Sequence, residues 1–478
     1  MEGSKGLKKD FISGVFWGII EKFSTLFIGF FITILLARKL TPADYGLVNM
    51  IYIFTVLANV ILDGGFGHAI IQKKDITIKD TSTVFYFNVI FSLVLYALLY
   101  AAAPLIANFY RQEQLIDIAR VAFLMLPINS LCIIQHTLLT KKIKVKELTT
   151  VTVCSSLVSG AVGIILAYNE YGVWALVYQS LTLQATRALV LWLVSSWRPI
   201  LVFDFQCIRS IWNFGINMLG VGTLAAIFQN IYTVVIGRFY NVNDVGFYNQ
   251  AQRLESIAST SLTSAIQRVS FPAFAEIQNE KKRLKEVFKK VINITMYIHF
   301  PLMIGLIMIS NEVFLILLGE KWLPSVPYFC LLCLASSLYP LHMINVNILK
   351  GLGLGKIYFK LESFKRVLMI LFIFITIKFN IIYLLCGYVG ATLISVICNM
   401  HYCGKSIDYK LTEQLKDLFP IFSSTGLMAM MIYLVKMINF TPFYQLIISI
   451  SIGIISYIIT SIIFKINSFY QLINLLKK

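Results

Sequence analysis

Charged residues are scarce in this chain of 478 residues. Asp, Glu, Lys and Arg make up 13% of it and hydrophobic residues 58%, whereas soluble globular chains carry about 25% charged and about 45 to 50% apolar residues. Such a chain has too few polar side chains to cover the surfaces of several soluble domains. The scarcity of charge excludes a soluble multidomain protein and indicates an integral membrane protein.

Metal-ligand and disulfide patterns are also missing. The five histidines are scattered, and none has a second ligand at metal-binding spacing. Cys330 and Cys333 lie three residues apart in an apolar run, without a second pair to complete a zinc site. All eight cysteines lie in or beside apolar stretches, as packed thiols do. We therefore expect no metal, no cofactor and no disulfide framework.

Long apolar runs, by contrast, are abundant. About 20 helical residues cross the ~30 Å hydrocarbon layer, and these runs lack the alternation of barrel strands. They predict an all-α integral membrane protein with about fourteen spans. The first is interrupted by Glu21 and Lys22 and has no cleavage site, so we expect it to be retained. The spans cover 11–36, 46–71, 83–107, 116–139, 149–168, 173–196, 211–236, 246–271, 291–318, 324–349, 367–384, 386–403, 418–437 and 443–464, with only Cys386 and its neighbours separating the eleventh from the twelfth.

The positive net charge of +18 comes from 41 Lys and Arg against 23 Asp and Glu. Nucleic acid is one class of partner for so basic a chain. Here, however, links rich in Lys and Arg alternate along the chain with links that have few. If the N-terminus is inside, 29 of these cations fall on the cytoplasmic side, seven on the other side and five within spans. This positive-inside pattern predicts cytoplasmic termini and no nucleic-acid partner.

An internal repeat accompanies the spans. A shift of 200 residues aligns Gly46 with Gly246 and Asp44 with Asp244. We predict a six-helix bundle at 1–205, a second in the same orientation at 206–405, and an added transmembrane hairpin with a cytoplasmic tail at 406–478. Transporters built from parallel repeats have this organisation, in which two facing bundles form a cleft with alternating access.

Six ionic residues lie inside predicted spans. Facing lipid at a helix centre would cost each about 3 kcal/mol, so they must face protein or water. Interhelical ion pairing is one interpretation. In the other, the cations among them bind an anionic group such as pyrophosphate, and the acids serve in gating or ion coupling. The predicted substrate-binding residues are Lys22, Arg253 and Arg187, and the predicted gating or coupling residues are Glu21, Asp63 and Glu255.

Several motifs resemble the polysaccharide flippases of the Wzx type, within the multidrug/oligosaccharidyl-lipid/polysaccharide exporter superfamily. The likeness covers nearly all of residues 10 to 410 and is greatest to the colanic-acid and teichuronic-acid exporter subgroup. Departures are the variable tail beyond residue 410 and His68, whose position has no clear meaning. The motifs include 43–47 (ADYGL), 63–67 (DGGFG), 172–177 (GVWALV), 197–199 (WRP), 271–273 (FPA) and, most specifically, 319–324 (GEKWLP).

This resemblance implies a flippase in the bacterial plasma (inner) membrane. Its substrate would be an oligosaccharide repeat unit linked to undecaprenyl pyrophosphate, used for O-antigen, capsule or exopolysaccharide. Membrane lipids, a polysaccharide polymerase and a chain-length regulator would be partners. The family's cationic central cavity maps onto Lys22 and Arg253, with Arg187 as a further member.

Two other functions compete with this one. A membrane glycosyltransferase, polymerase or ligase would present acidic or His residues in a sizeable outer loop, but the outer links here are short, so we expect no catalytic residue. A cation-coupled drug or metabolite exporter of the same fold is the closer alternative. Acids should dominate the cavity of such an exporter, whereas acids and cations are balanced in these spans.

Overall fold

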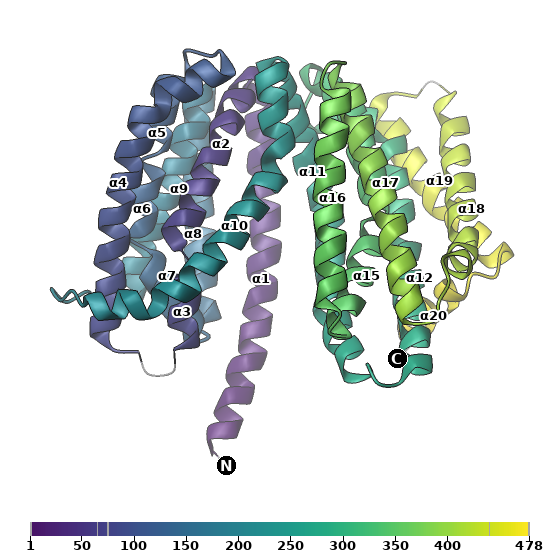
Figure 1. Cartoon of the computed structure of the whole chain (residues 1–478). Helices are drawn as coiled ribbons and strands as arrows, with labels where there is room; N and C mark the ends of the chain where they lie inside the picture. Colours follow the sequence, from purple (N-terminus) through teal and green to yellow (C-terminus); the bar gives the residue numbers. More distant parts are fainter. Residues whose placement is uncertain (1, 65, 74–75, 439, 477–478) are drawn as a thin grey trace. The chain divides into compact units, whose positions relative to one another are not determined.

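The computed structural model describes residues 2–64, 66–73, 76–438 and 440–476, and all regular structure in these ranges is helical. The chain separates into two compact units, Met1–Gly246 and Phe247–Lys478. Figure 1 shows the helices running side by side within each unit. The all-α fold class is thereby confirmed.

The first unit contains ten helices and the first turn of α11 among its described residues. The helices are α1 (Glu2–Lys39), α2 (Pro42–Asp63), α3 (Phe66–Gln72), α4 (Ile78–Tyr110), α5 (Leu115–Ala122), α6 (Met125–Ser130), α7 (Ile133–Lys141), α8 (Val145–Tyr168), α9 (Val173–Val194) and α10 (Phe205–Phe239).

The second unit holds the rest of α11 and the segments that follow it. They are α11 (Val242–Glu276), α12 (Lys281–Met308), α13 (Ser310–Leu317), a 3-10 turn (Glu320–Ser325), α14 (Val326–Ser337), α15 (Tyr339–Gly351), α16 (Gly355–Thr376), α17 (Ile381–Ser406), α18 (Leu411–Lys436), α19 (Pro442–Ile463) and α20 (Asn467–Leu476).

Ten helical segments among the described residues are long and apolar enough to cross a membrane. The pair Leu115–Ser130 and Ile133–Lys141, bent by 43°, makes an eleventh if it is one span. Helices α9, α11 and α16 lie where spans were predicted but do not meet this criterion. The protein is a multi-pass membrane protein, and the count of fourteen spans stays a prediction.

Several predicted spans are interrupted. The second span, 46–71, ends as a helix at Asp63, where Gly64 adopts a left-handed conformation with φ of 47° and α3 follows. The predicted boundary at Cys386 is wrong, because Cys386 lies inside α17, which Asn380 caps by accepting a hydrogen bond from the Tyr383 backbone N–H. Helix α16 begins well before residue 367.

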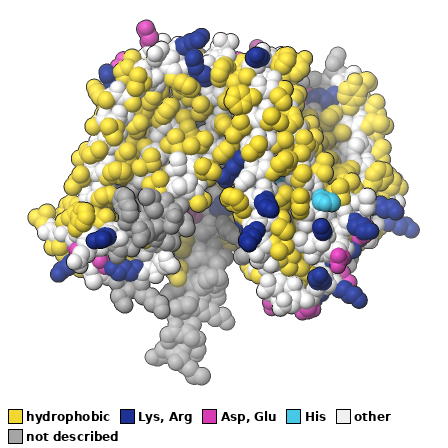
Figure 2. Space-filling model, viewed as in Figure 1, with side chains coloured by type: hydrophobic (Ala, Val, Ile, Leu, Met, Phe, Trp, Pro, Cys, Tyr) yellow, Lys and Arg dark blue, Asp and Glu magenta, His cyan; other side chains and the backbone are white. Residues whose placement is uncertain are grey.

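Large apolar side chains are exposed along the helices, as a lipid environment requires. Phe23 is 71% exposed and Leu193 82%. Figure 2 shows hydrophobic side chains over most of the face in view, with many Lys and Arg side chains near the ends of the helices.

The two ends of the first unit hold different sets of links. At one end, Lys141 donates to the Lys73 carbonyl oxygen, joining two links predicted to be cytoplasmic. At the other end, the Lys39 ammonium lies 4.4 Å from the centre of the Tyr168 ring, joining two links predicted to be outside. Links of the same predicted side therefore meet within this unit.

Helix α2 and the start of α11 cross at a very short distance. A Cβ atom at Gly46 would overlap the carbonyl oxygen of Val242, and one at Gly246 would overlap the carbonyl oxygen of Pro42. Only glycine leaves room for two backbones at such a separation. The two glycines that the 200-residue shift aligns thus occupy reciprocal positions in one crossing.

The terminal helices α18 and α19 pack on α12 and α13 within the second unit. The Tyr457 hydroxyl donates to the Tyr297 carbonyl oxygen at 2.8 Å. Lys436 pairs with Glu312 at 2.9 Å and donates to the Met308 carbonyl oxygen. The added pair is therefore joined to this unit by packing and by a largely buried ion pair.

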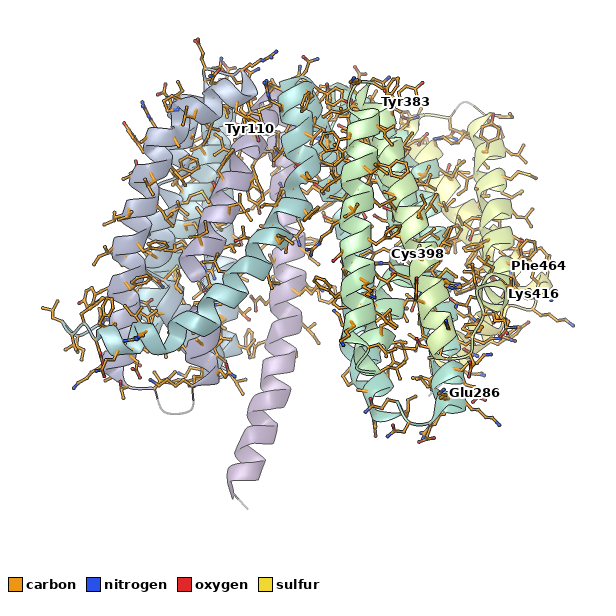
Figure 3. All side chains as sticks on the ribbon, in the orientation of Figure 1. Tyr110, Glu286, Tyr383, Cys398, Lys416 and Phe464 are labelled. Atoms are coloured by element: carbon orange, nitrogen blue, oxygen red, sulfur yellow. The ribbon has the colours of Figure 1, made fainter. Side chains whose placement is uncertain are left out.

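The links predicted to be cytoplasmic also meet within the second unit. Lys285 pairs with Glu413 at 2.9 Å and Lys289 with Asp417 at 2.7 Å. In Figure 3, Glu286 and Lys416 lie toward one end of this unit and Tyr383 at the other. The boundaries at 205/206 and 405/406 derive from sequence repetition, not from packing, and stay a prediction.

Candidate functional site

Three long helices, α9, α11 and α16, carry ionic residues within their length and do not meet the hydropathy criterion for a membrane span. Arg187 lies on α9, Arg253 and Glu255 lie on α11, and α16 carries a further charged cluster. Charged side chains are costly against lipid, so helices that carry them normally face protein or a wet cavity. These helices and α1 are therefore the natural place to look for a functional site.

On α1, Glu21 and Lys22 have different surroundings. Glu21 is half-buried, and its Oε1 atom accepts a hydrogen bond from the Thr152 hydroxyl of α8 at 3.2 Å. Lys22, one residue and about 100° further round the helix, is exposed. Helix α1 approaches α8 closely here, because the Thr149 hydroxyl also donates to the Trp17 carbonyl oxygen at 3.2 Å.

Asp63 is the last residue of α2 and is half-buried. A Cβ atom at Gly67 of α3 would lie 3.1 Å from the Asp63 carboxylate and 3.4 Å from the Thr137 hydroxyl of α7. The absence of a side chain at Gly67 therefore lets the Asp63 carboxylate lie close to the backbone of α3, where α2, α3 and α7 come together.

Arg187 lies beside a polar layer inside the first unit. Within this layer, Asn129 of α6 donates to Asn59 of α2 at 2.8 Å. Arg187 is half-buried and lies within electrostatic reach of Cys132 and His136 at the break between α6 and α7. No carboxylate of the described residues lies within ion-pair distance of its guanidinium, so a structural ion pair does not explain this cation there.

Two fully buried amides add to the polarity of the same unit. Asn88 of α4 and Gln135 of α7 are both 0% exposed, and neither their amide nitrogen nor their amide oxygen has a partner among the described residues. A buried amide without a partner costs about 1 to 3 kcal/mol. Such groups are normally satisfied by internal water or a ligand.

In the second unit, Arg253 is exposed and Glu255 is buried, with 7% exposure. The Ser259 and Ser336 hydroxyls lie near the Glu255 carboxylate, whose Oε1 atom has no hydrogen-bond partner among the described residues. The backbone carbonyl oxygen of Ser336 in turn contacts Nε2 of His299 at 2.9 Å. No cation among the described residues pairs with Glu255, so the interhelical ion pair considered from the sequence is not formed there.

Sequence reasoning missed a cluster on α15, α16 and α17. His342 Nε2 lies 3.2 Å from the Lys365 ammonium and 3.5 Å from Glu362, and His342 Nδ1 contacts the Asn399 amide. Lys365 precedes the predicted span 367–384, whereas in the structure it lies within α16. The three- and four-residue spacing of Glu362, Lys365 and Arg366, typical of one helix face, was the available signal.

Metal ligands do not cluster in the described ranges: no group of three or more His, Cys, Asp or Glu side chains there could hold a metal ion. What the described site residues offer is a set of cations and hydrogen-bonding groups. Such groups bind and orient an anionic ligand.

Comparison with known proteins identifies relatives of this chain. The family described as "Polysaccharide biosynthesis protein" matches residues 35–327. The teichuronic acid biosynthesis protein TuaB of Bacillus subtilis is 28% identical over 359 residues, covering 75% of this chain and 74% of the relative. The lipopolysaccharide biosynthesis protein WzxC of Escherichia coli is 25% identical over 369 residues, covering 76% and 74%.

Solved structures share the fold. The inward closed conformation of the lipid II flippase MurJ has a TM-score of 0.75 at 17% identity, covering 94% of this chain and 98% of that chain. An inward-facing MATE transporter of the MOP superfamily has a TM-score of 0.58 at 16% identity, covering 80% and 94%. The resemblance stated from the sequence motifs is confirmed. The chain belongs to the polysaccharide biosynthesis protein family and has the all-helical fold of MOP-superfamily transporters.

Proposed function

We propose that this protein is a flippase for lipid-linked oligosaccharides, moving repeat units from the cytoplasmic to the outer leaflet of a bacterial plasma membrane. The family match over residues 35–327 carries this proposal. Relatives are named for teichuronic acid, succinoglycan transport and lipopolysaccharide, which are different glycans. What such substrates can share is the carrier lipid, here undecaprenyl pyrophosphate, so the binding site should recognise the pyrophosphate.

The cations on the polar helices are suited to that recognition. Lys22, Arg253 and Arg187 are the proposed pyrophosphate ligands, because the fork of an Arg matches phosphate oxygens and Lys adds a compact charge. The absence of an ion-pair partner for Arg187 among the described residues supports its inclusion. Transport follows an alternating-access cycle in which the site faces each side of the membrane in turn.

The acidic residues have a separate proposed role in gating or ion coupling. Glu255 is the best supported of them, because two hydroxyls lie near its buried carboxylate, its Oε1 atom has no partner and no cation pairs with it among the described residues. A carboxylate in such a place can take up a proton or a metal cation without breaking an ion pair. Asp63 lies close against Gly67, and Glu21 accepts a hydrogen bond from Thr152. Both acids are proposed to respond to movement of their helices.

Replacing Glu255 by Gln should leave the protein folded but remove its response to an ion gradient. Gln keeps the size and hydrogen bonds of Glu, so we expect the unfolding temperature in detergent to change by less than about 4 °C. Transport is measured with a sodium gradient, a pH gradient or neither. The exposed Glu320→Gln is the matched control and should behave as wild type. An unchanged gradient response in Glu255→Gln would remove Glu255 from the coupling site.

Deletion and complementation test the function itself. Cells without the protein should accumulate lipid-linked repeat units on the cytoplasmic leaflet and lose surface polysaccharide, and the cloned gene should restore both. The leaflet is determined by treating intact spheroplasts with a membrane-impermeant pyrophosphatase. Normal surface polysaccharide together with increased sensitivity to cationic drugs would instead identify a drug exporter.

A further inference from the structure

A pocket of about 560 Å³ opens at the end of the first unit where the links predicted to be cytoplasmic meet. It is bordered by the start of α4, the end of α7 and the link after α9. Aliphatic side chains form one part of its lining. The polar part includes Lys141, Lys142, Lys144, Thr77, Ser196 and Trp197.

The wall formed by the link after α9 is held in place by hydrogen bonds. The Trp197 indole N–H donates to the Thr81 hydroxyl of α4 at 2.9 Å, and the Ile200 backbone N–H donates to the Ser82 hydroxyl at 3.0 Å. The Arg198 guanidinium bonds the Ser195 and Trp192 carbonyl oxygens at 2.6 and 2.8 Å. Trp197 is thus fixed as a pocket wall.

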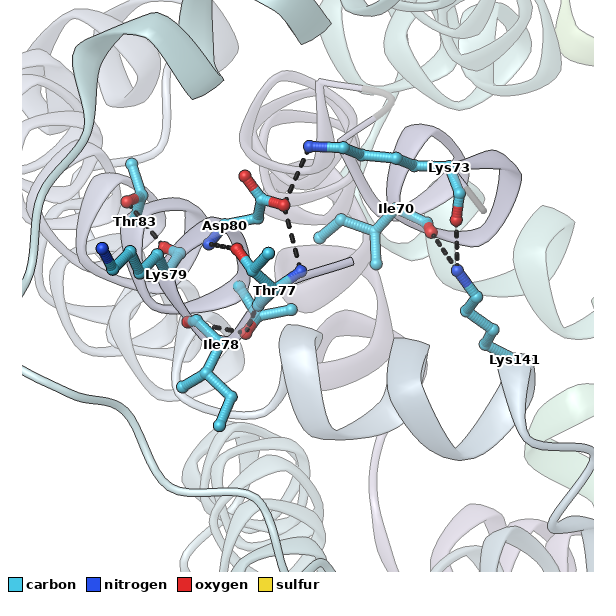
Figure 4. A network of polar contacts seen from close by, with 9 residues as sticks. Ile70, Lys73, Thr77, Ile78, Lys79, Asp80, Thr83 and Lys141 are labelled. Carbon is cyan, nitrogen blue, oxygen red and sulfur yellow. Dashed lines mark hydrogen bonds and ion pairs between the residues drawn. The ribbon is translucent and has the colours of Figure 1, made fainter. Parts of the chain in front are cut away.

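Two of the nearby lysines are already occupied by structural contacts, as Figure 4 shows. Lys73 pairs with Asp80 at 2.8 Å, and this contact holds the pKa of Lys73 above its usual range. Lys141 donates to the carbonyl oxygens of Ile70 and Lys73. These contacts join α3 to α4 and α7 and leave the remaining pocket lysines, Lys142 and Lys144, as candidates for a ligand.

A strained turn positions these two lysines. Helix α7 ends with the Lys144 N–H bonded to the Leu139 carbonyl oxygen and the Ile143 N–H bonded to that of Thr140, both at 3.0 Å. This is the pattern of a Schellman motif, in which glycine normally takes the left-handed position. Here that position holds Ile143 with φ of 54°, a conformation unfavourable for a β-branched residue.

Charge favours an anion in this pocket. Lys142 is exposed and has no hydrogen-bond or ion-pair partner within the part of the chain that the structure describes. Lys144 has only an exposed contact of 3.3 Å with Glu147. The described pocket lining contains three lysines and no acidic residue.

We infer that this pocket binds the phosphate of an anionic phospholipid from the cytoplasmic leaflet. Lys142 and Lys144 contact the phosphate, Thr77 and Ser196 face its glycerol, and Trp197 and the aliphatic wall receive the start of the acyl chains. Basic pockets between transmembrane helices on the cytoplasmic side are suited to such headgroups, and Trp favours this boundary between polar and apolar regions. A soluble phosphate would leave the aliphatic wall unused. This inference is independent of the transported substrate.

The experiment measures lipid binding to the purified full-length protein in detergent. Delipidated protein receives phosphatidylglycerol or phosphatidylcholine, and bound lipids are counted by native mass spectrometry. We expect Lys142→Ala/Lys144→Ala to lower phosphatidylglycerol affinity at least about tenfold, because each Lys near an anionic headgroup contributes on the order of a factor of five. Phosphatidylcholine binding should stay unchanged.

Control variants separate this site from general charge attraction. Lys281→Ala/Lys282→Ala removes the same charge from exposed positions on the same predicted membrane side and should bind as wild type. The charge-preserving Lys142→Arg/Lys144→Arg should also bind, which guards against loss of folding. Brominated phosphatidylglycerol should quench tryptophan fluorescence less in Trp197→Phe. Equal losses in both alanine pairs, or full displacement of the lipid by millimolar inorganic pyrophosphate, would overturn the inference.

Discussion

Replacing Lys22 and Arg253 together by Gln is expected to stop the outward movement of lipid-linked repeat units while folded protein remains in the membrane. Both side chains are exposed, so Gln at either position creates no cavity in a packed core. Hydrogen bonds to charged groups contribute about 1.5 to 3 kcal/mol each. Losing two should therefore slow export about 10² to 10⁴-fold. The measurement is the outer-leaflet fraction of repeat units in spheroplasts that carry only the variant.

The control removes one Lys and one Arg elsewhere. Arg209→Gln/Lys282→Gln takes one exposed cation from each unit, outside the proposed site, and should export normally. Arg187→Gln, tested alone, examines the third proposed ligand and should slow export by about 10 to 10²-fold. Normal export in the Lys22 and Arg253 double variant would exclude these residues as pyrophosphate ligands without excluding the flippase function.

Substituting Ala for Gly46 should have the largest effect on folding. Its Cβ would overlap a backbone carbonyl oxygen of Val242, which cannot rotate away as a side chain would. We expect the free energy of unfolding to fall by at least about 3 kcal/mol, which is the upper end of the usual cost of overpacking a protein core. Gly246→Ala should act similarly through Pro42. The double variant should lose less stability than the two single variants added together, because moving the two helices apart once makes room for both methyl groups.

Gly29 and Gly220 provide controls for the glycine prediction. Nothing lies within 4 Å of a Cβ atom at either position, so Ala there should be neutral or stabilise the helix by up to about 1 kcal/mol. Folded yield and thermal unfolding in detergent are measured for all variants. If Gly46→Ala unfolds at the wild-type temperature, the close crossing does not exist in the membrane.

Apolar segments and their approximate positions could be predicted from sequence because their signal lies in consecutive residues. Breaks within them were harder to predict. The bend between α6 and α7 follows Asn129 and Ser130, and the break after Met308 precedes Ser310, Asn311 and Glu312. These short polar groups lie inside long apolar runs, and averaging hydrophobicity over a whole span hides them. The opposite holds at α16, where Lys365 and Glu362 lowered the apolar signal although the helix begins at Gly355.

Side-chain partners could be predicted only in part. Helical geometry correctly indicated that Glu21 and Lys22 point to different surroundings. It did not indicate that Thr152 would meet Glu21, or that serines would meet Glu255, because such partners come from distant helices and hydroxyl residues are common in every span. The repeat likewise could not predict that Gly46 contacts Val242 and that Gly246 contacts Pro42. It aligned the two glycines in sequence but gave no information on their positions in space.

The ion pair between Glu312 and Lys436 bears on biogenesis. Its acid enters the membrane with α13, while its base is supplied by the end of α18, more than a hundred residues later in synthesis. Until α18 has been inserted, a carboxylate that is only 9% exposed in the finished protein has no ammonium beside it. An isolated charge at such a place is unfavourable. A nascent chain truncated before Lys436 would therefore lack the ammonium that neutralises Glu312 in the finished second unit.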